Sequence, residues 1–331
     1  MRRGSWLLLW TAPAWAQLWQ SPPADTIEQW KCGPGGCAAS PAPPFRFVKE
    51  DESGSTPKLE VRDANGRSWS VKFGAEVIPE CFASRFVTAA GYFAEPTYFV
   101  AEGKVEGIGK LRRARRMVKP DGRFARGRFE IRGSPDFVFV KDRSWGWTDR
   151  SLGGPHQLGG LKVVMMLLSN WDAKDDRDIG DSNNAVFRVT RNGKQTEQFG
   201  VFDWGASMGR WGKLMRRDQS DCAGFARDTP DFVRAAGGGP LHWGFVGKHS
   251  ADLTNATADD VRWLLPYLER LNPDHVVAGL RASGATDRQA RCWSESIQSR
   301  IREMRAAVST PAASFSSPSH SAASPLRPYH R

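Results

Sequence analysis

Three short segments of the chain carry residues whose types and spacing suit phosphate and metal chemistry. The first is Trp-Ser-Val-Lys-Phe-Gly, in which Lys72 lies late on an expected strand and the next expected helix carries Glu80. A lysine and a glutamate on neighbouring elements can form an ion pair, and the ammonium group is then placed to bind nucleotide phosphates. An ordinary surface salt bridge accounts for the pair equally well.

The second segment begins with Asn-Trp-Asp at the end of a long apolar run and continues to Ser-Asn-Asn. The residues of this segment that could take part in catalysis or bind a metal are Asp172, Asn183 and Asn184. In phosphoryl transfer an aspartate orients or deprotonates the attacking hydroxyl, and a downstream asparagine supplies an oxygen to Mg²⁺. A solvated acidic loop over residues 174–181 is the alternative that the sequence leaves open.

The third segment is Val-Phe-Asp-Trp-Gly, with Asp203 directly after an apolar strand. A carboxylate before a sharp turn offers a hard oxygen ligand to Mg²⁺. An aspartate near a glycine is also common in ordinary turns.

The elements that must position these residues can be read from hydrophobic periodicity and turn signals. Residues 65 and 66, Asn-Gly, predict a two-residue hairpin turn between two of the strands. Helix starts are indicated by capping residues at Thr257, Asn272 and Thr286. We expect strands over 45–49, 58–62, 68–73, 97–101, 185–189 and 199–202, and helices over 78–90 and 158–169. A strand-rich first half and a helical second half predict an α+β fold with a cleft between two lobes.

The order strand lysine, helix glutamate, helix-terminal aspartate, asparagine and strand-end aspartate resembles the protein-kinase-like superfamily. The similarity is closer to its atypical and lipid-kinase-like branches than to ordinary Ser/Thr kinases. The chain is also similar to a group of exported bacterial proteins that share the three segments. The resemblance spans 45–304 and implies a two-lobed kinase-like fold, with a small strand-rich N-lobe and a helical C-lobe.

The resemblance also implies a role for each residue and the cofactors ATP and Mg²⁺. Lys72 would bind the phosphates, Glu80 would orient Lys72, and Asp172 would be the base. The implied metal ligands are Asp203 with Asn183 or Asn184, and the implied phosphate-covering loop is Ser53, Gly54 and Ser55.

Three departures from the kinase pattern stand against these implied roles. The covering loop has one glycine, no His-Arg-Asp precedes Asp172, and the spacing from Asp172 to Asn183 is longer than usual. Arg177 occupies the usual asparagine position and cannot bind a cation, so a loop insertion or a lost metal ligand must be assumed.

The chain has 331 residues, 40% of them hydrophobic, and a formal net charge of +11. Much of the positive charge lies in the stretch from Lys110 to Arg132, which could bind an anionic partner such as an acidic polymer, membrane phosphates or a phosphorylated substrate. A solvated basic face is the simpler alternative. Single-stranded nucleic acid would require interleaved aromatic residues, and only Phe124 and Phe129 are present.

The two ends differ in composition from the body. Residues 1–16 have the pattern of a signal peptide with cleavage after Ala16, which predicts export to the periplasm or the extracellular space. We expect a Pro/Gly/Ala-rich linker over 17–44, an N-lobe over 45–142, a C-lobe over 143–307, and a disordered Ser/Pro-rich tail over 308–331. No segment reaches the roughly 20 apolar residues of a membrane-spanning helix.

Five cysteines are present. Cys32 and Cys37 flank a Gly-Pro-Gly-Gly turn that allows a small disulfide loop. The remaining three, Cys81, Cys222 and Cys292, are spaced like single buried cysteines.

Together these observations predict an exported kinase-like protein that binds a nucleotide with Mg²⁺ and transfers a phosphoryl group to a hydroxyl acceptor. Two alternatives stay open, a catalytically inactive kinase-like binding module of the cell envelope and an envelope protein held by its basic surface. The sequence contains neither Gly-x-Ser-x-Gly nor His-Glu-x-x-His, so serine hydrolase and zinc protease functions have no support.

Overall fold

A computed structural model describes residues 16–54, 56–132, 137–191, 193–211, 217–235 and 240–309. The predicted signal peptide, except Ala16, therefore lies outside the described residues. The same holds for Ser55 and for the predicted tail after residue 309.

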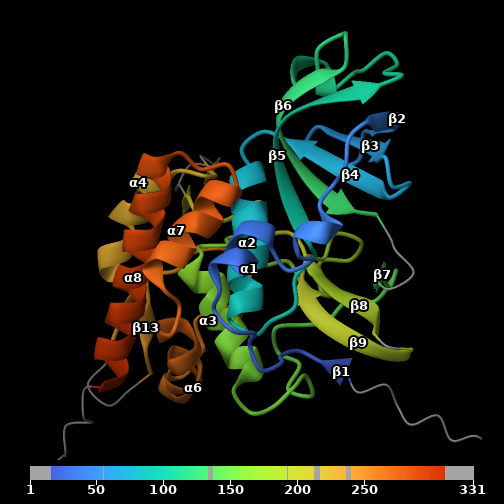
Figure 1. The fold of residues 1–331 in the computed structure, drawn as a ribbon. Coiled ribbons are helices and arrows are strands. Elements are labelled where there is room, and N and C mark those ends of the chain that lie inside the picture. The colour runs from blue at the N-terminus through green and yellow to red at the C-terminus, as the bar shows by residue number, and fades with distance from the viewer. Residues whose placement is uncertain are drawn as a thin grey trace, which may run out of the picture.

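The first half of the chain forms a closed barrel of five strands in the order β2-β3-β4-β6-β5 (Figure 1). The strands are β2 (Phe45–Asp51), β3 (Lys58–Arg62), β4 (Ser68–Phe73), β5 (Thr97–Glu106) and β6 (Arg123–Ile131). Alternate residues face inwards, and the barrel core contains Leu59, Val71 and Phe129, each fully buried.

Helix α2 (Val77–Ala89) follows β4 and lies against the barrel strands β5 and β6. It also packs on α7 (Pro273–Ala282). All but one of its residues are buried, because the helix has protein on every side. The helix therefore connects the barrel with the helical part of the molecule.

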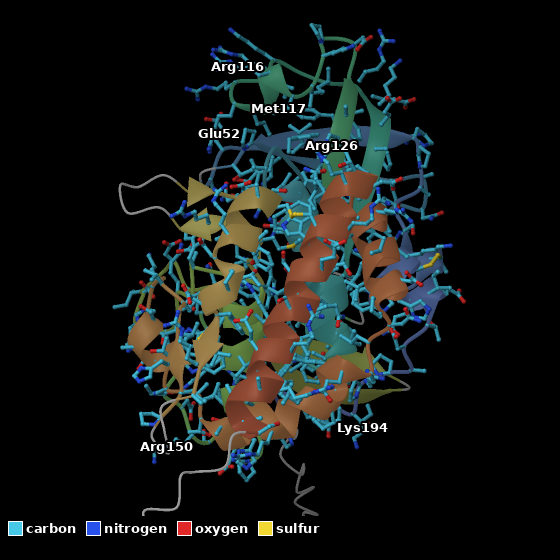
Figure 2. The ribbon with its side chains drawn as sticks, turned by 90° about the vertical axis from the view of Figure 1, so that its left-hand side faces the viewer. Glu52, Arg116, Met117, Arg126, Arg150 and Lys194 are labelled. Carbon is cyan, nitrogen blue, oxygen red and sulfur yellow. A yellow bond between two sulfur atoms is a disulfide. The ribbon has the colours of Figure 1, made fainter. Side chains whose placement is uncertain are left out.

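The helical part of the molecule contains the apolar helix α3 (Gln157–Leu167) and further helices. These are α6 (Ala258–Glu269), α7 and α8 (Asp287–Ser309), and α8 runs along the front of the view in Figure 2. Shorter helices are α1 (Ile27–Cys32), α4 (Cys222–Arg227) and α5 (Ser250–Leu253), with 3-10 turns at Cys37–Ala39, Ala114–Arg116 and Thr229–Asp231.

A four-stranded sheet lies beneath the barrel in the order β1-β9-β8-β7. Its strands are β1 (Ala16–Gln17), β7 (Phe137–Phe139), β8 (Asn184–Arg191) and β9 (Lys194–Val201). Two small antiparallel pairs are formed by β10 (Arg210–Trp211) with β11 (Arg217–Asp218), and by β12 (Val233–Arg234) with β13 (His242–Trp243). No helix in the described ranges combines the length and apolar character needed to span a bilayer.

The expected mixture of helices and strands is confirmed. The three capping residues begin α6, α7 and α8 as predicted, and Thr257 forms a full capping box with Asp260. Capping is a local interaction, which is why the sequence locates these helix starts accurately.

The segment 17–44 is not the linker that its composition predicted. Leu18 and Trp30 are each 1% exposed and belong to the main core, where Trp30 stacks on Phe82. Arg85 of α2 donates a hydrogen bond to the carbonyl of Trp30. A few large apolar residues are enough to anchor a segment that otherwise consists of small residues and proline.

The turn at Asn65-Gly66 also differs from the two-residue hairpin turn that was predicted. Residues 63–67 form a longer loop, in which the Asp63 carboxylate accepts hydrogen bonds from the backbone N–H groups of Asn65 and Arg67. Gly66 has a positive φ of 77° and Asn65 does not, so the turn lacks the two left-handed residues of the expected type.

Four of the five cysteines form disulfides. Cys32 pairs with Cys37, as the turn between them allows. Cys222 pairs with Cys292 and joins α4 to α8, which corrects the interpretation of these two residues as single cysteines. Cys81 on α2 is buried and unpaired.

Candidate active site

The ammonium group of Lys72 lies among three carboxylates, two that follow it closely in the chain and one, Asp203, that is distant. Its Nζ is 2.7 Å from Glu80 Oε1, 3.5 Å from Glu76 Oε2 and 3.9 Å from Asp203 Oδ2. Strand β4 carries Lys72, α2 carries Glu80, and Asp203 follows β9. The structure therefore brings the first and third predicted segments together.

Arg128 on β6 holds the other side of Glu80. It is directly opposite Lys72 in the antiparallel pairing of β4 and β6, so both side chains point to the same face. The guanidinium group forms ion pairs with Glu80 and Glu130, and all three of these side chains are buried. Glu80 is thus fixed between two cations.

Burial raises the pKa of Glu80 to about 7, although Arg128 and Lys72 act in the opposite direction. Burial alone would lower the pKa of Lys72, but the charges of Glu80 and Asp203 raise it above its ordinary value. Lys72 therefore remains a cation in the folded protein.

The Asp203 carboxylate is held in its ionised form. Burial opposes ionisation, but Lys72 and the backbone N–H of Gly205, which donates at 3.0 Å, lower the pKa of Asp203 below its ordinary value. A side chain at position 205 would meet Glu76 Cγ at 2.8 Å. The glycine two residues after Asp203 therefore leaves room for the Glu76 side chain, just before α2.

Asp172 is connected to Asp203 through Asn170, at the end of α3. The Asn170 side chain donates to the carbonyl of Asp203 at 3.1 Å and accepts from the backbone N–H of Asp172 at 3.3 Å. Asn183 donates to the carbonyl of Asp172 at 2.6 Å and to its carboxylate at 3.4 Å. The backbone of Asn183 also accepts from Phe202, next to Asp203. The second and third segments are thus held in one hydrogen-bonded unit.

The long spacing between Asp172 and Asn183 is accommodated by a loop that projects from this unit. The backbone N–H of Asn183 donates to the carbonyl of Lys174 at 3.1 Å and closes the loop. Arg177 forms ion pairs with Asp175 and Asp252 instead of approaching Asp172. The long spacing between Asp172 and Asn183 therefore corresponds to a closed loop in the structure.

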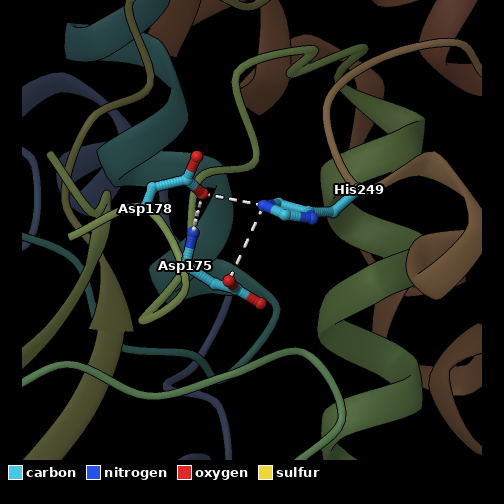
Figure 3. Close-up of side chains that lie close together, drawn as sticks. All are labelled: Asp175, Asp178 and His249. Atoms are coloured by element: carbon cyan, nitrogen blue, oxygen red, sulfur yellow. Dashed lines mark hydrogen bonds and ion pairs between the residues drawn. The ribbon is translucent and has the colours of Figure 1, made fainter.

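Two aspartates of the same loop, Asp175 and Asp178, form a cluster with His249, which lies just before α5 (Figure 3). His249 Nε2 is 2.7 Å from Asp178 Oδ2 and 3.6 Å from Asp175 Oδ1. Hydrogen bonds from Arg177 and the backbone of Trp147 to the Asp175 carboxylate outweigh its burial and lower its pKa. Since these cationic and backbone groups already satisfy the carboxylates, we interpret the cluster as the anchor of the loop.

Asn184 does not join the site. Its side chain donates to the carbonyl of Trp145 at 2.9 Å and is 2% exposed. Neighbouring residues on a strand point to opposite faces, so only one of the two asparagines can reach Asp172. Of the two predicted candidates, Asn183 is the one beside Asp172.

The predicted phosphate-covering loop lies beside the carboxylates that surround Lys72. Ser53 and Gly54 form hydrogen bonds away from the site: the Ser53 N–H donates to Asp51, and the Gly54 carbonyl accepts from Arg113 at 2.8 Å. Thr56, two residues further, donates to Glu76 at 2.7 Å. The loop is therefore attached to the site through Thr56, a residue that sequence reasoning did not single out.

Two lysines beside Asp172 were also missed. Lys174 Nζ is 3.2 Å from Asp172 Oδ2, and Lys248 Nζ is 3.8 Å from Asp172 Oδ1. Arg128 was predicted only as part of the basic stretch, which would bind an anionic partner or form a solvated face, whereas it is buried beside Glu80. The sequence signal that could have identified Arg128 is its place within an alternating strand-like segment that also carries Glu130.

No family model matches this chain, and no curated protein matches it either. Among solved structures, a crystal structure of the Golgi casein kinase is similar with 10% sequence identity and a TM-score of 0.40, covering 82% of this chain and 73% of that chain. The same kinase with Mn/ADP bound is similar with 9% identity, a TM-score of 0.41 and the same coverage. At these TM-scores the similarity carries no argument, and the site must be interpreted from its own geometry.

Proposed function

We propose that the protein is a kinase-like phosphotransferase that binds a nucleoside triphosphate with Mg²⁺ and transfers a phosphoryl group to a hydroxyl acceptor. The observation that carries the proposal is the meeting of Lys72, Glu80 and Asp203 from three separate elements, with Asp172 tied to Asp203 through Asn170. In this proposal residues 45–142 form an N-lobe, residues 143–307 form a helical C-lobe, and the nucleotide lies between them.

The oxygen atoms around Asp203 suit a hard divalent cation. Asp203 is ionised, and its side chain is 32% exposed, so an ion can reach it from solvent. Asp203 and the side-chain oxygen of Asn183 would hold the metal. When bound, Mg²⁺ neutralises phosphate charge that develops during transfer.

The protein's own residues have separate tasks in the reaction. Lys72 binds the phosphates, and Glu80 with Arg128 keeps its ammonium group in place. Asp172 orients the acceptor hydroxyl and takes its proton. The bond from the terminal phosphorus to the bridging oxygen breaks, and a new bond forms to the acceptor oxygen.

We also propose that the protein is exported. Its two disulfides support this proposal, because disulfides persist in oxidising compartments and are rare in the cytosol. The acceptor hydroxyl would then belong to a molecule of the same compartment.

Thermal unfolding with and without ATP and Mg²⁺ tests nucleotide binding. For wild type at a ligand concentration of about 100 Kd, we expect Tm to rise by roughly 5 °C. Asp203→Asn should abolish the rise, whereas Asp176→Asn, the same change at an exposed aspartate of the loop between Asp172 and Asn183, should keep it. Absence of any nucleotide-dependent rise at millimolar ATP would exclude the enzymatic function.

An inactive nucleotide-binding module is the second candidate, and the surroundings of Lys72 favour it. The ammonium group is already within 4 Å of three carboxylates, which compete with phosphates for its charge. Single-turnover release of ADP distinguishes the two candidates. If the protein is an active enzyme, wild type releases ADP, whereas Asp172→Asn binds ATP and releases none. If it is an inactive module, wild type and Asp172→Asn bind ATP equally and neither releases ADP.

A further inference from the structure

The cations of the basic stretch from Lys110 to Arg132 fall into two groups. We call a cation engaged when its side chain binds an acidic residue or a carbonyl of the protein, and unengaged when it forms no ion pair. Arg112 and Arg113 belong to the engaged group. Their backbone N–H groups donate to the Glu50 carboxylate, and their side chains bind Glu52 and the carbonyl of Gly54. These two arginines hold the segment after β5 against the β2–β3 loop.

Arg128 and Arg132 are engaged at the other end of the stretch. Arg128 is neutralised by Glu80 and Glu130, and Arg132 Nη1 is 3.6 Å from Glu130 Oε1. The buried charge of Arg128 is therefore used within the candidate active site, and Arg132 is paired beside it.

A pocket of about 760 Å³ at the end of the β5–β6 ribbon is lined by several cations without an ion-pair partner, among them Lys104, which precedes the stretch. Lys104, Arg115, Arg116 and Lys119 line it and form no ion pair with any described residue. Arg123, which pairs with Asp121 at 2.7 Å, and a single acidic residue, Glu102, complete its charged lining. We call this site the apical basic pocket.

An apolar side chain lies among these cations. Met117 also lines the pocket and is 41% exposed, so an apolar side chain reaches solvent beside these cations. Figure 2 shows Arg116 and Met117 at one end of the molecule, with Arg150 and Lys194 at the opposite end. Cationic and apolar groups are thus presented together at an extremity, where a planar surface can approach them.

We propose that the apical basic pocket binds the headgroups of anionic phospholipids at a membrane surface. The lysine and arginine side chains attract the lipid phosphates, and Met117 enters the interfacial region between headgroups. Binding of this kind weakens as salt screens the charges.

Other anionic macromolecules fit the pocket less well. An extended peptide commonly pairs with an exposed strand edge, but beside the pocket Val118 already bridges Phe124 and the Lys119 N–H donates to the Arg123 carbonyl, so this edge of β6 is covered by the chain itself. Single-stranded nucleic acid needs aromatic faces for stacking, and the aromatic residue of the pocket, Phe124, is 5% exposed.

The pocket is separate from the candidate active site. In the pairing of β5 with β6, Lys104 is opposite Arg123, whereas the residue that contacts Glu80 is Arg128. Five residues of strand correspond to roughly 17 Å. Membrane binding is therefore independent of the proposed nucleotide site, and the two proposals can fail separately.

Co-sedimentation of the full chain with vesicles tests the proposal, using phosphatidylcholine alone and phosphatidylcholine mixed with phosphatidylglycerol. We expect wild type to bind only the mixed vesicles and to be released by salt. The triple variant Arg115→Glu, Arg116→Glu, Lys119→Glu should bind at least about tenfold more weakly. Met117→Ser should weaken binding at every salt concentration.

The matched control changes the same charge on the exposed face of α8, as Arg288→Glu, Arg291→Glu, Arg302→Glu. This control and Asp203→Asn should bind mixed vesicles like wild type. Equal weakening in the α8 control would show that net charge alone is responsible and would overturn the proposal.

Two further results would also overturn it. One is unchanged vesicle binding in the triple variant, or in Arg115→Gln, Arg116→Gln if the triple variant does not fold. The other is binding of a polyglutamate peptide that depends on the pocket, together with no binding to vesicles, since that result assigns the pocket to an acidic protein.

Discussion

Among single residues, Arg128 shows how the environment of a side chain determines its role. The sequence places it in a run of cations that are mostly exposed, yet its guanidinium group is 2% exposed and bound to two carboxylates. Because a buried cation without partners is very costly, the ion pairs with Glu80 and Glu130 are a condition for folding as well as for placing Lys72.

The first prediction concerns the removal of this cation. Arg128→Met should lower the free energy of unfolding by about 3 to 5 kcal/mol, because Glu80 and Glu130 would remain buried without their partner. Urea unfolding measures the loss. Arg62→Met, on the exposed face of β3, is the control and should change stability by less than about 0.5 kcal/mol. Similar losses in both variants would show that the buried ion pairs contribute little.

The sequence indicated the candidate lysine and aspartates of the site better than the residues that surround them. Lys72, Asp172 and Asp203 each stand at the end of a recognisable element, so their types and positions were informative without coordinates. The choice between Asn183 and Asn184 depends on the phase of a strand that begins at that point, and a single sequence does not define that phase. Lys248 lies far along the chain from Asp172 and carries no motif, so only the fold reveals the contact.

At the scale of elements, the β2–β3 loop is closed by one carboxylate at its start. Asp51 accepts a hydrogen bond from the Ser53 N–H at 2.9 Å and is 3.2 Å from Lys58 Nζ. This closure positions Thr56 next to Glu76. The loop is thus fixed at its base and attached to the site near its end.

The second prediction is the pH dependence of this closure. Burial opposes ionisation of Asp51, but hydrogen bonds from Ser53 and Lys58 lower its pKa to about 2. A lowered pKa contributes stability that is complete above the ordinary value of about 3.9 and is lost as the pH falls toward 2. Asp51→Asn should therefore cost about 1 kcal/mol at neutral pH, after allowance for solvent screening, and progressively less below pH of about 4.

Urea unfolding of wild type and Asp51→Asn between pH 6 and pH 3 measures this difference. Glu60→Gln removes an exposed pair with Lys49 and should cost less than Asp51→Asn at pH 6. A difference between wild type and Asp51→Asn that does not change with pH would mean that the charge of Asp51 is not the cause.

For the whole molecule, the N-terminal segment shows what composition does not reveal. Asp25 accepts from the backbone N–H of Asn272, lies 3.1 Å from His275 Nδ1, and also accepts from Trp30. Arg270 donates to the carbonyl of Pro23. Each of these partners except Trp30 is more than 200 residues away, so the segment is ordered by the fold and not by its own sequence. Similarly, the pairing of Cys222 with Cys292 depends on how α4 and α8 meet.

The third prediction compares the two disulfides as constraints on the unfolded chain. Cys32 and Cys37 are five residues apart, whereas Cys222 and Cys292 are 70 apart. The entropy of loop closure predicts a stabilisation of about 2 kcal/mol for the short loop and about 4 kcal/mol for the long one. Urea unfolding of the double variant Cys32→Ser, Cys37→Ser and of the double variant Cys222→Ser, Cys292→Ser should show this order.

Reduction of wild type should lower the free energy of unfolding at least as much as the larger of the two losses. Equal losses in the two double variants, or no effect of a reductant on wild type, would contradict a role of the α4–α8 disulfide in holding the helical part together.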